Sequence, residues 1–252
     1  MELIVLGSGS SVPHPRRASS GYWLQADSGS VLLDCSAASV HRMAQEGCDW
    51  VNLDAIWVSH FHLDHCGGLA PLLFGTKHAP ETQGRTKPMH IFGPSGLRKI
   101  IETFDSAYDY GLFRQPFPLE IVEVEAGKKF EIAGFSASVF STPHTDDSHA
   151  IRLEADDGRS FVFTSDTGYS TNLAVFARGV DLLLAECSFI TQTPVKIHLE
   201  AKDIVQMAKF ANAERIVLTH LYPEWDGRED EAVEIFAGLN VEIAYDGMRI
   251  QT

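Results

Sequence analysis

Four side chains that bind metal ions lie within six consecutive residues: His60, His62, Asp64 and His65. Neutral imidazole and carboxylate groups suit Zn²⁺, Mn²⁺ or Fe²⁺ as ligands. In an extended segment alternate side chains point the same way, so His60, His62 and Asp64 are predicted to converge on one point. His65, the next residue, then faces a neighbouring point. The spacing therefore predicts half of a hydrolytic site that holds two metal ions.

This run is expected to begin where a buried strand ends. Residues 53–59 are apolar and rich in β-branched side chains, as in a strand. Loops at strand ends are where active sites are usually built. The alternative is a loop that is rich in histidine by chance. Imidazoles and a carboxylate packed this densely would repel one another or titrate without a cation, which favours the metal site.

The run of residues 60–65, followed by Cys66 and then two glycines, resembles the first metal motif of the metallo-β-lactamase superfamily. Further segments resemble the later motifs of that superfamily in chain order. Their characteristic residues are Asp34, His144, Asp166 and His220. Residues 6–20 resemble the opening of the ribonuclease Z-like branch. The resemblance extends from residue 1 to residue 223, and Ser165 departs from it by replacing the usual glycine.

The resemblance implies an α/β fold, the αββα sandwich, in which two mixed sheets pack face to face with helices outside. The order of expected elements agrees with such layers. Strands are expected at 3–6, 22–26, 31–34, 55–59, 89–93, 119–123, 136–141, 149–155, 160–165, 182–186, 215–218 and 241–244. Helices are expected at 38–46, 68–74, 95–108, 172–177, 201–211 and 230–236. With no repeat and no long linker, residues 1–252 are expected to form a single domain.

The resemblance also implies ligands for two divalent ions, Zn²⁺ first, with Mn²⁺ or Fe²⁺ as alternatives. One ion is expected to take three imidazoles, the other a carboxylate and two imidazoles, and a further carboxylate is expected to bridge them. In that order the ligands are His60, His62 and His144, then Asp64, His65 and His220, then Asp166. A bridging hydroxide is the expected nucleophile, because paired ions lower the pKa of bound water to about 7. Asp64 is also expected to act in catalysis.

Glu186 and His198 are expected to assist the leaving group. Glu186 lies where the ribonuclease Z-like branch has the glutamate of a His-Glu-Ala-Thr segment, and His198 lies where that branch has a histidine at the start of a helix. A hydrogen bond from His198 to Glu186 would raise the proton affinity of the imidazole and fix its tautomer. His198 would then protonate a departing alkoxide, which contributes about 10²–10⁴-fold. The alternative is an ordinary strand-end acid and helix-start histidine.

The net charge and the short segment between two of the motifs restrict the class of substrate. The sequence has 34 Asp plus Glu against 20 Lys plus Arg, a formal net charge of −14. Such a surface repels nucleic-acid backbones at long range. Ribonuclease Z carries a tRNA-gripping arm between its third-motif histidine and its aspartate motif, but only a short strand pair fits between His144 and Asp166. We therefore expect a phosphodiesterase for a small molecule or short oligonucleotide, and not for extended nucleic acid.

Three other functions remain open. An acyl hydrolase for a lactone, thioester or β-lactam would use the same metal site, although it has less need of Glu186 and His198. A tRNA 3′-processing endoribonuclease of the ribonuclease Z type is the second. The third is a flavodiiron redox protein, which His62 disfavours because such proteins have a glutamate at that position.

Cysteine usage and hydropathy predict a cytoplasmic protein. The four cysteines are scattered without CxxC spacing, which predicts reduced thiols. Residues 1–6 lack a basic segment and enter a strand directly, and no stretch is long and apolar enough to cross a bilayer. No membrane partner is expected. A homodimer is expected from the resemblance alone.

Overall fold

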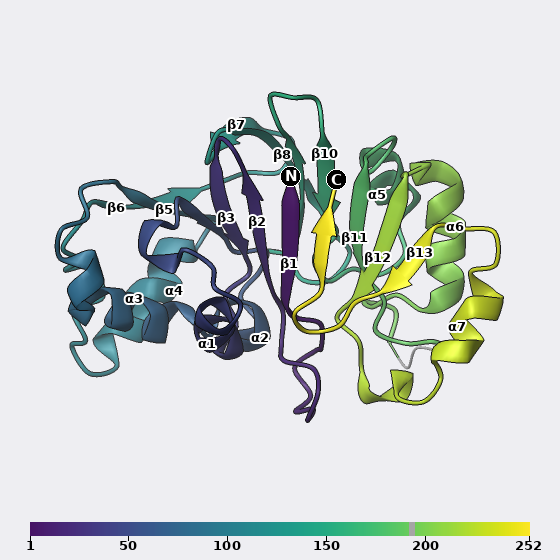
Figure 1. Ribbon diagram of the computed structural model, residues 1–252, viewed down its shortest axis with the longest axis horizontal. Coiled ribbons are helices and arrows are strands. Elements are labelled where there is room, and N and C mark those ends of the chain that lie inside the picture. Colours follow the sequence, from purple (N-terminus) through teal and green to yellow (C-terminus); the bar gives the residue numbers. More distant parts are fainter. Residues whose placement is uncertain (192–194) are drawn as a thin grey trace.

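Two sheets packed face to face form the protein, shown in Figure 1 as a computed structural model that describes residues 1–191 and 195–252. Within these residues each sheet has seven strands, in the orders β14-β1-β2-β3-β4-β5-β6 and β13-β12-β11-β10-β9-β8-β7. Both sheets combine antiparallel and parallel pairs. Helices lie outside the sheets (Figure 1). The predicted αββα sandwich is confirmed.

The bounds of the elements are as follows. The first sheet contains β1 (Glu2–Gly7), β2 (Gly21–Ala26), β3 (Gly29–Leu33), β4 (Ala55–Trp57), β5 (Met89–Gly93), β6 (Leu119–Glu123) and β14 (Arg249–Gln251). The second contains β7 (Lys129–Ile132), β8 (Phe135–Ser141), β9 (His149–Glu154), β10 (Ser160–Phe163), β11 (Leu182–Glu186), β12 (Arg215–Thr219) and β13 (Val241–Ile243). The helices are α1 (Ala37–Gln45), α2 (Leu63–Cys66), α3 (Leu69–His78), α4 (Leu97–Ser106), α5 (Thr171–Phe176), α6 (Ala201–Ala211) and α7 (Glu229–Ile235), with 3-10 turns at Trp50–Asn52, Pro80–Thr82 and Pro223–Trp225.

The sequence-based prediction misses β7, β14 and α2. Strand β14 has three residues and pairs with β1 from the far end of the chain, Leu3 lying opposite Ile250. Strand β7 forms a hairpin with β8 through Ala133 and Gly134, which both have left-handed backbone angles. Such angles suit a tight hairpin turn, but alanine gives no turn signal in the sequence. The local sequence therefore gives too weak a signal to predict either strand.

Burial on both faces explains the continuous apolar runs of the central strands. All five residues of β11 are buried, and a strand covered on both faces cannot alternate apolar and polar side chains. One core lies between the sheets around Trp57, Phe135 and Phe161. Two further cores lie beneath the helices, one against each sheet. The four cysteines are buried and unpaired, as predicted.

Parallel neighbours bring the ends of several strands to one edge. Strand β3 runs parallel to β4, β10 to β11, and β11 to β12. Parallel strands that share a sheet end on the same side, which is where such sheets bind ligands. The residues at or after the ends of these strands include much of the expected site, at 34, 60–65, 166, 186–188 and 220. The topology therefore brings the expected metal-binding motifs together at one edge of the two sheets.

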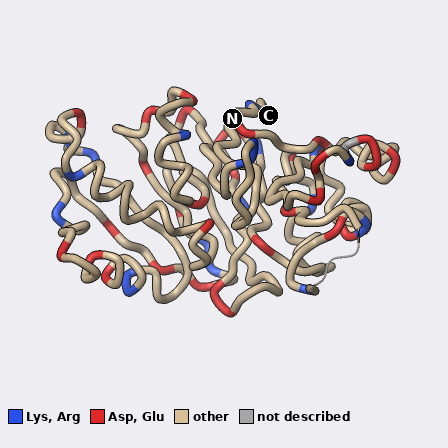
Figure 2. The backbone as a smooth tube through the Cα atoms, turned by 90° about the horizontal axis from the view of Figure 1, so that it is seen from below, with Lys and Arg blue, Asp and Glu red and all other residues tan. Residues whose placement is uncertain are grey.

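The charged residues do not gather into a basic track in the view of Figure 2, where Lys and Arg are scattered among Asp and Glu over both halves of the molecule. No helix of the described chain is both long and apolar enough to cross a bilayer. The full sequence has a formal net charge of −14.

Candidate metal centre

Histidine and aspartate side chains from both sheets meet where the strands end. Their ligand atoms form three groups, each with its atoms within 4.8 Å of one another. The groups are His60, His62, His144 and Asp166; then Asp64, His65 and His220; then Asp166, His198 and His220. All seven expected metal ligands and His198 thus come together, and Glu186 contacts His198.

The first group has the spacing of a tetrahedral ligand shell. Nε2 of His60 lies 3.0 Å from Nδ1 of His62, and that atom lies 3.2 Å from Nε2 of His144. Oδ2 of Asp166 lies 3.6 Å from Nε2 of His144. Ligands bound tetrahedrally at about 2.0–2.1 Å lie about 3.3 Å apart. These residues could therefore hold a divalent ion.

The second group lies on the other side of Asp166. Oδ2 of Asp64 lies 3.5 Å from Nε2 of His65 and 3.4 Å from Nε2 of His220. Asp166 faces the same two imidazoles, with Oδ1 at 3.4 Å from His65 and Oδ2 at 3.3 Å from His220. Asp166 thus contacts both groups, as expected of a bridging carboxylate.

Two buried atoms of this cluster lack hydrogen-bond partners, which supports a cation there. They are Nε2 of His65 and Oδ1 of Asp166. Buried polar atoms are nearly always paired, so each unpaired one needs an explanation. A divalent cation accepts a lone pair from both an imidazole nitrogen and a carboxylate oxygen. The residues present therefore fit such an ion.

The electrostatics of the cluster also favour positive charge. Burial, together with the nearby His65, lowers the pKa of His60 to about 2, which leaves its imidazole neutral. Burial alone would lower the pKa of His65, but the Asp166 and Asp34 carboxylates outweigh it and raise that pKa. Burial would likewise raise the pKa of Asp166, but His220 and His65 hold it well below its usual range. The anionic carboxylates thus attract cations.

One part of the sequence-based geometry is wrong. Alternation along an extended segment does not bring Asp64 to the point shared by His60 and His62, because Leu63–Cys66 forms the helical turn α2. His62 is the N-cap of that turn and is still extended. The turn moves Asp64 beside His65 and His220 instead. A four-residue helix leaves too short a pattern to be predicted.

Three strands end in a left-handed residue at this edge. Asp34, Ser165 and His220 have φ angles of 57°, 58° and 56°. Glycine adopts this conformation most readily and aspartate tolerates it, whereas serine and histidine are strained in it, and such strained residues cluster at functional sites. The φ angle of Ser165 is one that glycine would adopt without strain, which agrees with the glycine that the resemblance implied at this position.

Asp34 organises the first sheet's half of the centre. Its Oδ2 accepts hydrogen bonds from Nδ1 of His65 at 2.6 Å and from Oγ of Ser59 at 2.9 Å, and its Oδ1 accepts from the Ser59 amide at 2.8 Å. Oγ of Ser59 also lies 3.1 Å from Nδ1 of His60. One buried carboxylate therefore orients two metal-facing imidazoles, one of them through a serine.

Glu186 organises the second sheet's half. Its Oε1 accepts from Nδ1 of His198 at 2.8 Å and from the Thr167 amide at 2.9 Å. Its Oε2 accepts a hydrogen bond from Oγ of Ser188 at 2.8 Å, and the Ser188 Oγ also lies 3.1 Å from Nδ1 of His220. Burial would lower the pKa of His198, but the hydrogen bond to Glu186 outweighs it and raises that pKa.

Sequence reasoning assigned no role to Ser59, Ser188 or the Ile197 carbonyl. Ile197 accepts a hydrogen bond from Nδ1 of His144 at 3.0 Å. Ser59 precedes His60, and Ser188 follows Glu186 by two positions. Their adjacency to motif residues was the available signal.

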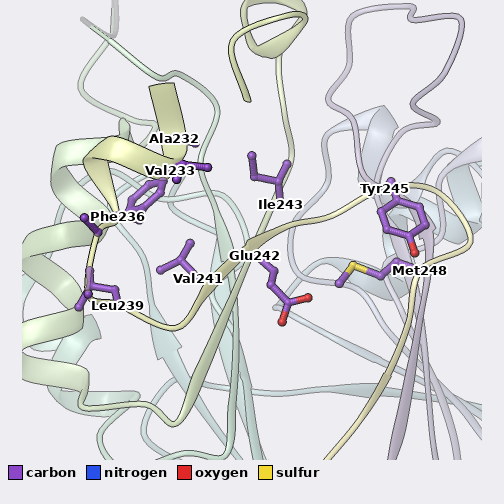
Figure 3. A pocket seen from close by; sticks show the side chains of 11 residues that line it. Ala232, Val233, Phe236, Leu239, Val241, Glu242, Ile243, Tyr245 and Met248 are labelled. Carbon is purple, nitrogen blue, oxygen red and sulfur yellow. The ribbon is translucent and has the colours of Figure 1, made fainter. Parts of the chain in front are cut away.

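A separate groove of about 580 Å³ lies between α7, the edge strand β13 and the segment that leads into β14 (Figure 3). Its lining includes Val233, Phe236, Leu239, Tyr245 and Met248. The described residues that line it include no histidine and no member of the metal cluster. We therefore place the chemistry at the cluster.

Comparisons with known proteins agree with this architecture. The family model described as "Anti-Pycsar protein Apyc1" matches residues 1–238. The chain is 27% identical to Ribonuclease Z of Mycobacterium bovis over 277 aligned residues, which cover 100% of this chain and 98% of that protein.

Solved structures show the same fold. The metallo-β-lactamase fold protein YhfI from Bacillus subtilis superposes with a TM-score of 0.81 and 25% identity, covering 99% of this chain and 98% of that chain. Human tRNase Z, short form, superposes with a TM-score of 0.78 and 22% identity, covering 100% and 99%. The protein is therefore a hydrolase of the metallo-β-lactamase fold and belongs to the family described as Anti-Pycsar protein Apyc1.

Proposed function

We propose that the protein is a metal-dependent phosphodiesterase that cleaves a small or short phosphodiester. The observation that carries the proposal is the Glu186–His198 pair, joined by a hydrogen bond of 2.8 Å beside the metal cluster. Divalent ions bound in the cluster would supply an activated water as nucleophile and stabilise negative charge on the attacked centre.

The proposed centre holds two divalent ions, Zn²⁺ first and Mn²⁺ or Fe²⁺ as alternatives. The spacing of the ligand atoms and the unpaired buried atoms of His65 and Asp166 support it. The proposed ligands are His60, His62, His144, Asp64, His65, His220 and Asp166. Asp64 and Asp166 bring two negative charges, which would offset part of the charge of two divalent cations.

His198 is proposed to donate a proton to the departing oxygen. Its Nδ1 is held by the Glu186 carboxylate, so its other ring nitrogen, Nε2, is the one that can reach the substrate. The pKa of His198 is raised despite its burial, because the hydrogen bond to Glu186 stabilises the imidazolium. A protonated His198 can therefore act as a general acid near neutral pH, worth about 10²–10⁴-fold.

The size of the substrate is limited by the fold around the site. Between His144 and Asp166 the chain forms β9 and β10, joined by residues 155–159, and this interval has no room for a tRNA-gripping arm. The formal net charge of −14 disfavours extended nucleic acid. The name of the Mycobacterium bovis relative supports tRNA 3′ processing as the second candidate.

Assembly and location are proposed in the same way. A homodimer is supported by the neighbouring rings of Phe74, Tyr108 and Tyr110, which are exposed by 45%, 79% and 39%. A cytoplasmic location is supported by the four free thiols. A single domain over residues 1–252 is supported by the contribution of both sheets to one centre.

A substrate panel tests the reaction. The protein, loaded with Zn²⁺ or Mn²⁺, would be given bis-p-nitrophenyl phosphate, a 2′,3′-cyclic nucleotide, an acyl lactone and a tRNA precursor. We expect turnover of the small phosphodiesters. Lactone turnover without any phosphodiester cleavage would establish an acyl hydrolase, and efficient cleavage of the tRNA precursor alone would establish a tRNA-processing enzyme.

An Asp166→Ala variant tests the proposed centre. We expect it to lose bound metal and activity together, because Asp166 contacts both groups of ligands. Asp157→Ala is the control, since that carboxylate is exposed in the turn between β9 and β10 and pairs with Arg159. Metal content measured by mass spectrometry decides; an inactive Asp166→Ala variant that keeps two ions contradicts the bridging role.

A further inference from the structure

The serine hydroxyls that join a carboxylate to a metal-facing histidine occur once in each sheet. We propose that Ser59 and Ser188 fix the tautomers of His60 and His220, so that both imidazoles present the lone pair of Nε2 to the metal centre. The inference rests on the metal centre of the proposed function and assigns two positioning residues to it.

The two arrangements are alike in distance and burial. Oγ of Ser59 lies 2.9 Å from Asp34 and 3.1 Å from Nδ1 of His60. Oγ of Ser188 lies 2.8 Å from Glu186 and 3.1 Å from Nδ1 of His220. Both serines are fully buried. Neither hydroxyl therefore turns to bulk solvent.

The direction of the hydrogen bonds follows from counting protons. A carboxylate can only accept hydrogen bonds, and a hydroxyl has a single proton. Asp34 accepts three hydrogen bonds from His65 and Ser59, and Glu186 accepts from Thr167, His198 and Ser188, which suits an ionised group. The proton of each serine therefore points to its carboxylate.

The serine oxygen is then left with lone pairs toward the histidine. A contact of 3.1 Å between Oγ and Nδ1 requires a hydrogen between them, and only the imidazole can supply it. A neutral imidazole has one N–H, so Nε2 keeps its lone pair. That nitrogen lies 3.4 Å from Asp64 in His220 and 3.0 Å from His62 in His60.

Two other imidazoles of the cluster have an Nδ1 acceptor that is not a serine. His65 donates from Nδ1 directly to Asp34, and His144 donates to the Ile197 carbonyl. Among the described residues, Nδ1 of His60 and Nδ1 of His220 each have only a serine oxygen as hydrogen-bond partner. Without the hydroxyls, either ring nitrogen could carry the proton, and the wrong tautomer would have to change before it could bind a metal ion.

Ser160, another buried serine, lies in the second sheet and is a matched control for Ser59 and Ser188. Oγ of Ser160 donates to the Asp181 carboxylate at 2.8 Å, and Ser160 is 7% exposed. Its described hydrogen-bond partners include no imidazole. Loss of this hydroxyl removes a serine–carboxylate hydrogen bond without affecting any tautomer.

Nitrogen-15 NMR of the Zn²⁺-loaded parent protein tests the inference directly. We expect His60 and His220 each to carry hydrogen on Nδ1 and to coordinate through Nε2. Coordination through Nδ1 in either residue overturns the proposal. This readout needs no substrate, so it stands even if the protein cleaves no phosphodiester.

Variants then test whether the hydroxyls are responsible. Chelator competition should show that Ser59→Ala and Ser188→Ala each weaken the binding of one Zn²⁺ ion about 10–100-fold, whereas Ser160→Ala binds as the parent does. Ser188→Thr keeps a hydroxyl and should restore affinity to within a few-fold. Parent-like affinity in both alanine variants, or a threonine variant as weak as Ser188→Ala, overturns the proposal. If an alanine variant does not fold, the parent spectrum and Ser188→Thr decide.

Discussion

Asp34, which follows β3, and Glu186, which ends β11, are buried carboxylates of the two sheets, and they contact different histidines. Asp34 binds His65 directly and reaches a second histidine through Ser59. Glu186 binds His198 directly and reaches its second histidine through Ser188. In the first sheet the serine belongs to the histidine's own segment, and in the second it belongs to the segment of the carboxylate.

The difference lies at the other ring nitrogen of the directly bound histidine. Nε2 of His65 lies 3.5 Å from Asp64 and 3.4 Å from Asp166, so negative charge surrounds it. Among the described residues, His198 has its only carboxylate oxygen within 4.0 Å at Nδ1, on Glu186. In the proposed function the same kind of carboxylate–histidine pair therefore binds a cation at His65 and delivers a proton at His198, depending on what faces Nε2.

The largest expected effect comes from His198→Ala. We expect cleavage of a phosphodiester with an alkoxide leaving group to fall about 10²–10⁴-fold, while the metal content stays at that of the parent. Cleavage of bis-p-nitrophenyl phosphate should fall much less, because p-nitrophenolate departs without a proton. An equal loss for both substrates, or a loss of metal, would place His198 among the metal ligands and erase the contrast with His65.

Asp34→Asn tests the other side of the comparison. The amide keeps the size of the side chain but cannot accept the hydrogen bonds of His65 and Ser59 with the strength of a carboxylate. We expect the affinity for metal to fall about 10–100-fold, measured by chelator competition. Unchanged affinity would show that Asp34 does not orient the proposed ligands.

Glu186→Gln should change the pH dependence of the reaction. The pKa of His198 is raised by Glu186 against the effect of burial, and the protonated form is the proposed acid. Activity should therefore fall as pH rises through that raised pKa. In the variant the falling limb of kcat should move to lower pH, because burial then dominates. A limb that stays in place would mean that another group sets it.

Ser165→Gly should have the smallest effect, on stability rather than on chemistry. Ser165 and Asp34 share a left-handed backbone, with φ angles of 58° and 57°, but only Asp34 orients a proposed ligand. Glycine adopts this conformation without strain, so we expect the variant to gain about 0.5–1 kcal/mol in the free energy of unfolding. Urea denaturation measures it; a loss of stability would show that the hydroxyl contact with Ser148 outweighs the strain.

The sequence alone determined the fold class and the chemical types at the centre. Four of the seven proposed ligands lie in residues 60–65, and the others follow apolar strands in a recognisable order. Such signals are local, so they survive in a linear pattern. The Glu186–His198 contact was also predicted, because both residues stand in segments of a known motif.

Tertiary structure alone decided which groups face one another. The turn α2 places Asp64 beside His65 and His220, as the resemblance implied, and not beside His60 and His62, as alternation along a strand predicted. Ser188 meets His220 across 32 positions, and His65 meets Asp34 across 31. Hydrogen-bond direction, and with it the tautomer of each imidazole, depends on these non-local contacts. The run at His60 therefore predicted a metal site, while the packing of the two sheets decided which carboxylates and serines each histidine contacts.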